Sequence, residues 1–264
     1  MSTNNNRLGK EVQPKWEVDQ KESKITKVSG QKLQRMMKNS IADITALSLR
    51  GRSIEKIEDL NGFAQLQRLD LSDNCLRRIA AMSNVPHLGM LNASKNILSG
   101  SSSCEDLRYL IELRTLNIGS NPNLKHLESH IVKPLAKLQA LVANDCGLEK
   151  VSFLKYCQRL NTLVLSKNAL TRFPTVENLS FLLLTKLSLG HNSLEALPDL
   201  TVCPNLLELR LNNNRISELS EVIKVPTKLK ILELSVNLLS SWENIEILCS
   251  LKHLTNLSLK GESD

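Results

Sequence analysis

One pattern of leucines recurs along most of the chain and constrains its fold more than any other feature. The template Leu-x-x-Leu-x-Leu-x-x-Asn-x-Ile/Leu fits the sequence ten times, at intervals of 22 to 25 residues. A fixed period of this length is the signature of a repeat architecture, in which each unit buries its apolar face against its neighbours. The ten copies begin at Ile44, Leu66, Leu88, Leu113, Leu138, Leu160, Leu184, Leu206, Leu229 and Leu254.

The composition agrees with a repeat architecture rather than an ordinary globular core. The chain has 264 residues and 41% hydrophobic content, which would suffice for one large domain or two ordinary ones. Aromatic residues, however, make up only 3% of the chain, whereas globular cores draw much of their volume from aromatic side chains. The core is therefore expected to be built from leucine and isoleucine.

Each copy of the template predicts a strand followed by a turn and a short helical segment. In Leu-x-Leu the two leucines point into the core, so the residue between them lies on the opposite, concave face. The second half of each copy has turn residues and short apolar spacings, which favour short helices or 3₁₀ turns on the convex face. The predicted fold is an α/β solenoid, a leucine-rich repeat horseshoe with about ten parallel strands on its concave face.

The asparagine of the template lies where the chain turns away from the sheet. Its amide both donates and accepts hydrogen bonds, so it can satisfy backbone groups that would otherwise be buried without partners. Cys146 takes this place in the fifth copy, and Arg52 and Glu262 take it in the first and last. The predicted structural ladder consists of Asn74, Asn96, Asn121, Asn168, Asn192, Asn214 and Asn237.

Three segments are expected along the chain. Residues 1–27 are polar and lysine-rich and predict a disordered basic arm. Residues 28–43 predict a capping helix that begins after Ser29, runs to about Asn39 and covers the first repeat. Residues 44–264 form the leucine-rich repeat domain, with nine full repeats and a partial tenth. The formal charge of +7 is concentrated before residue 40, where nine Lys/Arg oppose four Asp/Glu.

The last copy would leave its leucines facing an open end of the solenoid. These are Leu254, Leu257 and Leu259. A solenoid needs terminal caps because its core is exposed at both ends. We therefore expect the chain to be a fragment that lacks its C-terminal cap, the alternative being that another molecule covers this end.

The register of the repeats predicts which side chains line the concave face. Met90, Ala140, Val142 and Val164 form a small apolar strip with charged residues on both sides. An apolar centre with a charged rim is typical of protein interfaces, although valine also favours strands without any partner. The predicted partner-binding residues are Arg68, Asp70, Met90, Asn92, Asn117, Ala140, Val142, Thr162, Val164, Lys186, Ser188, Glu208, Arg210 and Glu233.

Sequence motifs for catalysis are absent. There is no G-x-S-x-G, P-loop or GxGxxG motif, and His126 and His130 share a segment without a carboxylate or cysteine pattern that would indicate a metal site. We expect no enzymatic activity, cofactor, metal or small-molecule substrate. The basic arm lacks the interleaved aromatic residues of a base-stacking surface, so we expect at most weak contact of this arm with nucleic acid or an acidic surface.

The sequence also predicts an intracellular protein, nuclear or cytoplasmic. No apolar run is long enough to span a bilayer, so no membrane partner is expected, and the first residues lack the apolar stretch of a signal peptide. The six cysteines occur singly, which is typical of reduced thiols rather than of a disulfide framework.

Several segments resemble a known group of proteins. LQRLDLSDNCLRRI, LNTLVLSKNAL, LLELRLNNNRISEL and LKHLTNLSLKG are similar to the intracellular SDS-type leucine-rich repeat proteins, over most of residues 44–261. This group includes a regulatory subunit of protein phosphatase 1, the A-prime protein of the U2 spliceosomal particle and an axonemal dynein light chain. The later half also resembles poorly characterised eukaryotic leucine-rich repeat proteins.

The resemblance implies a noncatalytic protein-protein interaction scaffold that holds a protein partner across the concave face. Two alternatives remain open at this point. One is a regulatory subunit of protein phosphatase 1, and the other is a structural subunit of a ribonucleoprotein or of a ciliary or axonemal complex.

Overall fold

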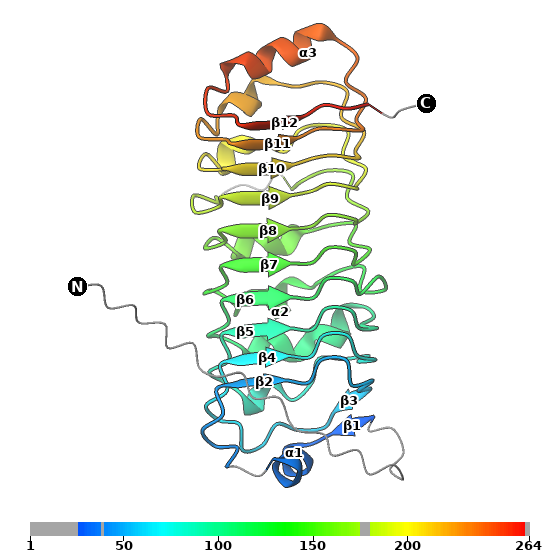
Figure 1. Cartoon of the computed structure of the whole chain (residues 1–264), viewed down its shortest axis with the longest axis vertical. Helices are drawn as coiled ribbons and strands as arrows, with labels where there is room; N and C mark the ends of the chain where they lie inside the picture. Colours follow the sequence, from blue (N-terminus) through cyan, green and yellow to red (C-terminus); the bar gives the residue numbers. More distant parts are fainter. Residues whose placement is uncertain (1–25, 38–39, 175–179, 262–264) are drawn as a thin grey trace, which may run out of the picture.

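The structure is a computed structural model that describes residues 26–37, 40–174 and 180–261. Ten parallel strands lie in one sheet, in the order of the chain (Figure 1). The predicted leucine-rich repeat horseshoe is confirmed. The strands are β2 (Ala46–Ser48), β4 (Arg68–Asp70), β5 (Met90–Asn92), β6 (Thr115–Asn117), β7 (Ala140–Val142), β8 (Thr162–Val164), β9 (Lys186–Ser188), β10 (Glu208–Arg210), β11 (Ile231–Glu233) and β12 (Asn256–Ser258).

The strands pair in one constant register, central leucine to central leucine. Leu69 of β4 pairs with Leu47 of β2 on one side and with Leu91 of β5 on the other, and the same pairing continues to Leu257 of β12. The central leucines of β2 to β11 are at most 1% exposed. Leu257 is 44% exposed, because no described element covers the outer side of β12 as helix α1 (Gly30–Met36) covers that of β2.

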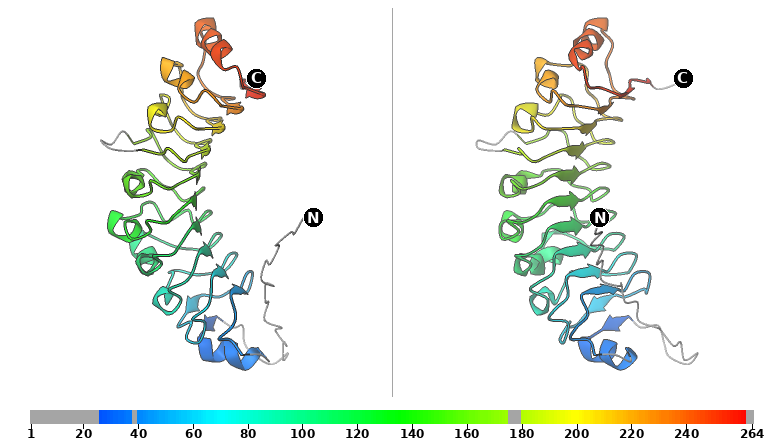
Figure 2. Two further views of the ribbon diagram at one scale, coloured as in Figure 1. Left: turned by 90° about the vertical axis from the view of Figure 1, so that its left-hand side faces the viewer. Right: turned by 60° about the vertical axis from the view of Figure 1, so that its left-hand side comes forward.

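The convex face is formed by short helices, as the sequence predicts. Figure 2 shows them along the outer side of the arc, opposite the strands. The longest is the nine-residue 3₁₀ segment η2, which follows Gly100. The convex elements are η1 (Met82–Asn84), η2 (Ser101–Tyr109), α2 (Ser129–Val132), η3 (Ser152–Tyr156), η4 (Leu200–Val202), η5 (Glu221–Lys224), α3 (Trp242–Glu246) and η6 (Ile247–Ser250).

The N-terminal end of the sheet is covered by a helix and a small second sheet. Helix α1 begins after Ser29, whose Oγ accepts a hydrogen bond from the Lys32 amide at 3.3 Å. It is shorter than the segment expected from the sequence: Met37 is already extended, and Asn39 lies outside the described residues. Leu33 is fully buried, so the helix packs on the first repeat.

The second sheet is a feature that the repeat pattern does not predict. Strand β1 (Lys27–Val28) pairs in parallel with β3 (Lys56–Ile57), so Lys27, assigned to the arm from the sequence, lies in a strand. The remainder of the predicted arm, residues 1–25, lies outside the described residues. Gly30 closes the contact between α1 and the first repeat, because a Cβ there would lie 2.2 Å from the Asn61 carbonyl oxygen.

The ladder asparagines connect successive repeats through their side-chain amides. Asn121 is completely buried. Its Oδ1 accepts from the Leu98 amide of the preceding repeat, and its Nδ2 donates to the carbonyls of Ala93 and Ile118 at 3.2 and 2.7 Å. Each amide thus bonds its own turn to the turn before it. Equivalent bonds are made by Asn74, Asn96, Asn168, Asn192, Asn214 and Asn237.

Cys146 occupies the same place with a simpler pattern of bonds. Its Sγ donates to the Ile118 carbonyl at 3.2 Å, but a thiol has no counterpart to the accepting Oδ1 of asparagine. The Leu124 amide, which would be bonded by that oxygen, instead donates to the Asn121 backbone carbonyl at 3.0 Å. Replacement of the ladder asparagine by Cys146 therefore does not leave the Leu124 amide unpaired.

Replacing Asn121 by alanine should strongly destabilise the protein. The substitution leaves the buried Leu98 amide without its partner and removes one of the two bonds to the carbonyls of Ala93 and Ile118, so we expect a loss of about 2–4 kcal/mol in the free energy of unfolding. Urea denaturation followed by circular dichroism measures it. Asn237→Ala is the matched control with a smaller expected loss, because Asn237 is only half-buried and water can reach the vacated groups. Equal losses in the two variants would contradict the role of burial.

The residue before each ladder position has a left-handed backbone. Such a conformation is tolerated by Gly, Asn and Asp but is strained for a β-branched residue. Val236, with φ 55°, is the β-branched member of this set. The positions are Gly51, Asp73, Lys95, Ser120, Asp145, Lys167, His191, Asn213 and Val236.

Val236→Asn should therefore raise stability by about 1 kcal/mol, because asparagine adopts this conformation with less strain. The midpoint of urea unfolding measures the effect. The reciprocal substitution Asn213→Val, at the equivalent position of the preceding repeat with φ 54°, should lower stability by a similar amount. A destabilised Val236→Asn protein would show that the valine contributes more by packing than it costs in backbone strain.

Candidate functional site

The structure places all fourteen predicted partner-binding residues on the concave side of strands β4 to β11. They form two columns, one from the first residue of each strand and one from the third. Met90, at 44% exposure, is the most accessible of the large apolar ones. Ser188 is only 7% exposed, so its side chain is poorly placed to contact a partner.

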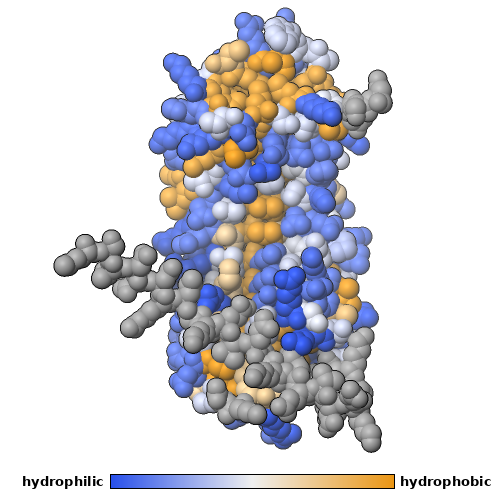
Figure 3. Space-filling view, in the orientation of Figure 1, coloured by the Kyte–Doolittle hydropathy of each residue, from blue (hydrophilic) through white to orange (hydrophobic). Residues whose placement is uncertain are grey.

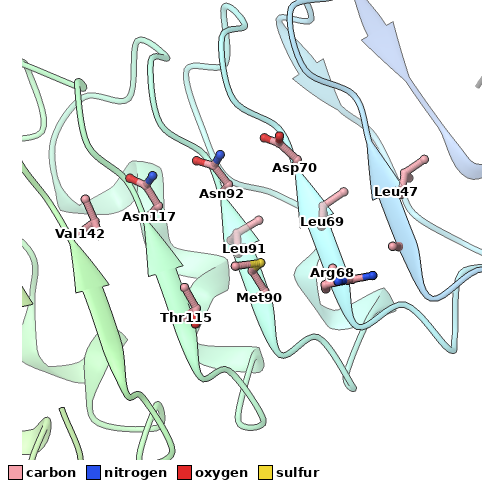
Figure 4. A pocket seen from close by; sticks show the side chains of 11 residues that line it. Leu47, Arg68, Leu69, Asp70, Met90, Leu91, Asn92, Thr115, Asn117 and Val142 are labelled. Atoms are coloured by element: carbon pink, nitrogen blue, oxygen red, sulfur yellow. The ribbon is translucent and has the colours of Figure 1, made fainter. Parts of the chain in front are cut away.

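A hollow of about 310 Å³ lies on the N-terminal half of this face (Figure 4). Its floor is formed by the buried leucines at the centres of β2, β4 and β5. The first residues of the strands contribute Arg68, Met90 and Thr115 to the hollow. Thr115 is not in the set predicted from the sequence, although its register between Met90 and Ala140 places it in the same column. The predicted residues brought together here are Arg68, Asp70, Met90, Asn92, Asn117 and Val142.

The polar residues of the second column have a structural task at the ends of their strands. Asp70 Oδ1 accepts from the amide two residues later at 2.9 Å, and Asn92 and Asn117 make the same bond at 3.2 and 3.0 Å. These side chains thereby favour the turn that ends each strand. The Nδ2 groups of Asn92 and Asn117 make no hydrogen bond with the described residues. Both side chains line the hollow, so a ligand bound there can accept hydrogen bonds from these groups.

Two valines replace this polar column in the next two strands. Val142 of β7 pairs with Val164 of β8, and Ala140 pairs with Thr162 beside them. Both valines are half-buried and offer no hydrogen bond to the following turn. Figure 3 shows the resulting hydrophobic strip along the middle of the concave face. We call Ala140, Val142 and Val164 the apolar strip; Met90, which the sequence grouped with them, is separated from them by β6.

The C-terminal half of the face carries a network of four charges on three adjacent strands. Lys186 Nζ lies 3.0 Å from Glu208 Oε1, and Arg210 contacts both Glu208 and Glu233, the latter at 2.8 Å. Two cations and two anions are thus held together across β9, β10 and β11. The predicted charged rim on this side is therefore neutral as a group.

The network changes the acidity of its central carboxylate. Burial opposes ionisation of Glu208, but the hydrogen bonds from Arg210 and Lys186 outweigh it, so the pKa of Glu208 lies below its usual value. A carboxyl group with a lower pKa in the folded state stabilises the fold above its unfolded pKa, and this contribution disappears as the pH falls through the folded value.

Glu208→Gln should consequently destabilise the protein at neutral pH and have less effect in acid. The variant loses both ion pairs of the central carboxylate at pH 7, whereas wild type loses them only as the pH falls below about 4.3 toward the lower folded pKa. Thermal unfolding of both proteins between neutral and acidic pH measures the difference. A difference in melting temperature that stays constant over this range would contradict the assigned pKa direction.

Side chains that could hold a metal ion do not cluster in the described residues, which contain no group of three or more His, Cys, Asp or Glu able to do so. His130 Nε2 instead lies 3.1 Å from Glu105 on the convex side. In the same described ranges, no helix is long and apolar enough to cross a membrane.

The cysteines are free, and the buried ones are poor nucleophiles. Burial raises the pKa of Cys104, Cys157 and Cys203 to about 12, and that of Cys146 to about 11. The thiolate is the reactive form, so these four side chains are almost entirely unreactive at neutral pH. Their role is to fill the core.

Comparison with known proteins agrees with this geometry. A leucine-rich repeat protein from Leptospira interrogans superposes with a TM-score of 0.72 at 22% identity, covering 90% of this chain and 64% of that one. The chain has the leucine-rich repeat fold. The Toll-like receptor TLR13, solved in complex with ssRNA13, has a TM-score of 0.63 at 22% identity over 81% of this chain and 32% of the receptor. At these identities the likeness concerns the fold alone.

Two sequence relatives support the same conclusion. Tsukushi from Gallus gallus is 30% identical over 173 residues, which are 62% of this chain and 46% of Tsukushi. Leucine-rich repeat serine/threonine-protein kinase 1 from Mus musculus is 32% identical over 149 residues, 53% of this chain and 7% of the kinase. The chain thus spans less than half of either relative. A scan of this sequence against protein-family models finds no match.

Proposed function

We propose that this leucine-rich repeat protein is a noncatalytic scaffold that binds a protein partner through its concave face. The observation that carries the proposal is the apolar strip of Ala140, Val142 and Val164, which lies between the polar third residues of β4 to β6 and the charged network of β9 to β11. An apolar centre that excludes water and a polar rim that fixes orientation are the parts of a protein interface.

The surroundings of the strip favour a protein ligand over a highly charged one. Toward the C-terminus, the cations Lys186 and Arg210 are already neutralised by Glu208 and Glu233. Toward the N-terminus, the hollow offers the thioether of Met90 and the free amide donors of Asn92 and Asn117. A folded surface or a helix that presents apolar residues with backbone or side-chain carbonyls matches these groups.

The proposal places the protein in the SDS-type subgroup and inside the cell, in the nucleus or cytoplasm. The segments quoted above support the subgroup. The six free cysteines support a reducing compartment, because thiols stay reduced there. The N-terminal arm adds at most weak contact with nucleic acid or an acidic surface.

The double substitution Val142→Glu/Val164→Glu should abolish partner binding while leaving the fold intact. Both side chains are half-buried on the concave face, so glutamate remains solvated in the free protein but is desolvated at the interface. Affinity purification with mass spectrometry, comparing wild type with the variant, measures the loss. We expect at least a tenfold reduction in the recovered partner, since an unpaired charge buried at an interface costs more than about 1.4 kcal/mol.

Ile111→Glu/Leu182→Glu is the matched control. These residues are 56% and 60% exposed and lie outside the concave columns, so the control adds the same charge and removes as many apolar side chains. It should bind the partner as wild type does. Retention of the partner by the concave variant, or its loss from the control, would move the binding site away from the strip.

A further inference from the structure

A second surface lies at one edge of the solenoid, where the chain leaves the first four strands. The turns after β2, β4, β5 and β6 follow one another along this edge, on the side to which the arrows point in Figure 1. Strands lie about 4.8 Å apart, so these four turns extend over roughly 14 Å. We call five exposed side chains in them the basic edge: Arg50, Arg77, Arg78, Lys95 and Lys125.

The basic edge carries an unusual share of the protein's positive charge. Residues 50–56, 72–78, 94–100 and 119–126 together contain seven Lys/Arg and two Asp/Glu, a net charge of +5. The whole chain carries +7. This charge is separate from the lysine-rich segment before residue 40.

The cations of the basic edge are not neutralised within the described part of the chain. None of the five forms an ion pair there, whereas some cations elsewhere, such as Lys137, Lys186 and Arg210, do. On the opposite edge, for example, Lys137 Nζ lies 2.6 Å from Glu112 Oε1, and on the concave face Lys186 and Arg210 are paired with glutamates. The basic edge therefore attracts an external anion.

The groups between these cations indicate which anion fits. Exposed hydroxyl and amide groups, such as those of Ser99 and Asn123, occur in the same turns as the basic side chains. Arginine and lysine together with such donors are the groups that contact the phosphates and sugars of nucleic acids. A series of cations along one edge also suits a polymer with regularly spaced charges.

The scarcity of aromatic and large apolar residues in these turns narrows the choice of ligand further. They contain no Phe, Tyr or Trp, so there is no surface on which unpaired bases can stack, as single strands require. Ile97, 43% exposed, is their one large exposed apolar side chain, which leaves little to anchor a peptide. A duplex, whose bases are already stacked and whose phosphates face outward, needs neither feature.

We propose that the basic edge binds double-stranded nucleic acid through its phosphates, without reading the base sequence. The site is distinct from the concave face. Each cation that contacts a phosphate releases a condensed counterion, so the logarithm of the binding constant falls with the logarithm of the salt concentration by about 0.9 per contact. Five contacts predict a slope of about −4.5 from this edge.

The test compares the full-length protein with Arg77→Ser/Arg78→Ser/Lys95→Ser. Fluorescence anisotropy of a short labelled RNA duplex, and of a DNA duplex of the same sequence, is measured over a series of potassium chloride concentrations. The triple variant should bind both duplexes at least tenfold more weakly, and its slope should be smaller in magnitude by about 3. Scrambling the base sequence should leave wild-type affinity unchanged.

The matched control is Arg159→Ser/Lys228→Ser/Lys252→Ser, which removes three exposed cations from the opposite edge and the same net charge. It keeps the basic edge and should retain most of the wild-type affinity and slope. Equal weakening in the two triple variants would overturn the proposal, because net charge alone would then explain binding. Tighter binding of a glutamate-rich peptide than of either duplex would also overturn it, by showing an acidic protein segment to be the ligand.

Discussion

The side-chain amide of the ladder asparagine is the interaction on which the other features of the structure depend. It bonds backbone groups of its own turn and of the preceding turn, and the carbonyls of Ala93 and Ile118 each accept from two successive ladder side chains. No repeat is therefore satisfied alone, and stability becomes a sum over neighbouring pairs. The bond also sets one constant register, which arranges the outer side chains in straight columns.

These columns explain why the concave face can carry function. The ladder and the central leucines account for the stability of each repeat, which leaves the first and third strand residues free to vary. In β4, β5 and β6 the third residue is still used, since Asp70, Asn92 and Asn117 each bond the turn that follows. Val142 and Val164 give up that bond and expose apolar surface, a loss that binding to a partner would offset.

Repeat periodicity predicted the fold class and the ten parallel strands, because one template specifies buried leucines, strand and turn together. It did not predict β1, since Lys27 and Val28 lie outside any repeat and pair with β3 only through the folded end of the solenoid. Nor does the sequence show that Ser188 is buried or that Lys186 and Arg210 share Glu208 and Glu233. Those properties depend on how side chains from three strands fill the space between them.

The same register gives the concave face and the basic edge opposite electrostatic properties. On the face, side chains of adjacent strands converge, so oppositely charged residues at one column position meet and cancel, as Glu208 and Arg210 do with their neighbours. In the turns, successive side chains point into solvent at the edge, and like charges such as Arg77 and Lys95 accumulate without ion-pair partners among the described residues. Neutral apolar contact and long-range attraction of anions are thereby separated on one scaffold, and each can change by substitution without disturbing the ladder beneath it.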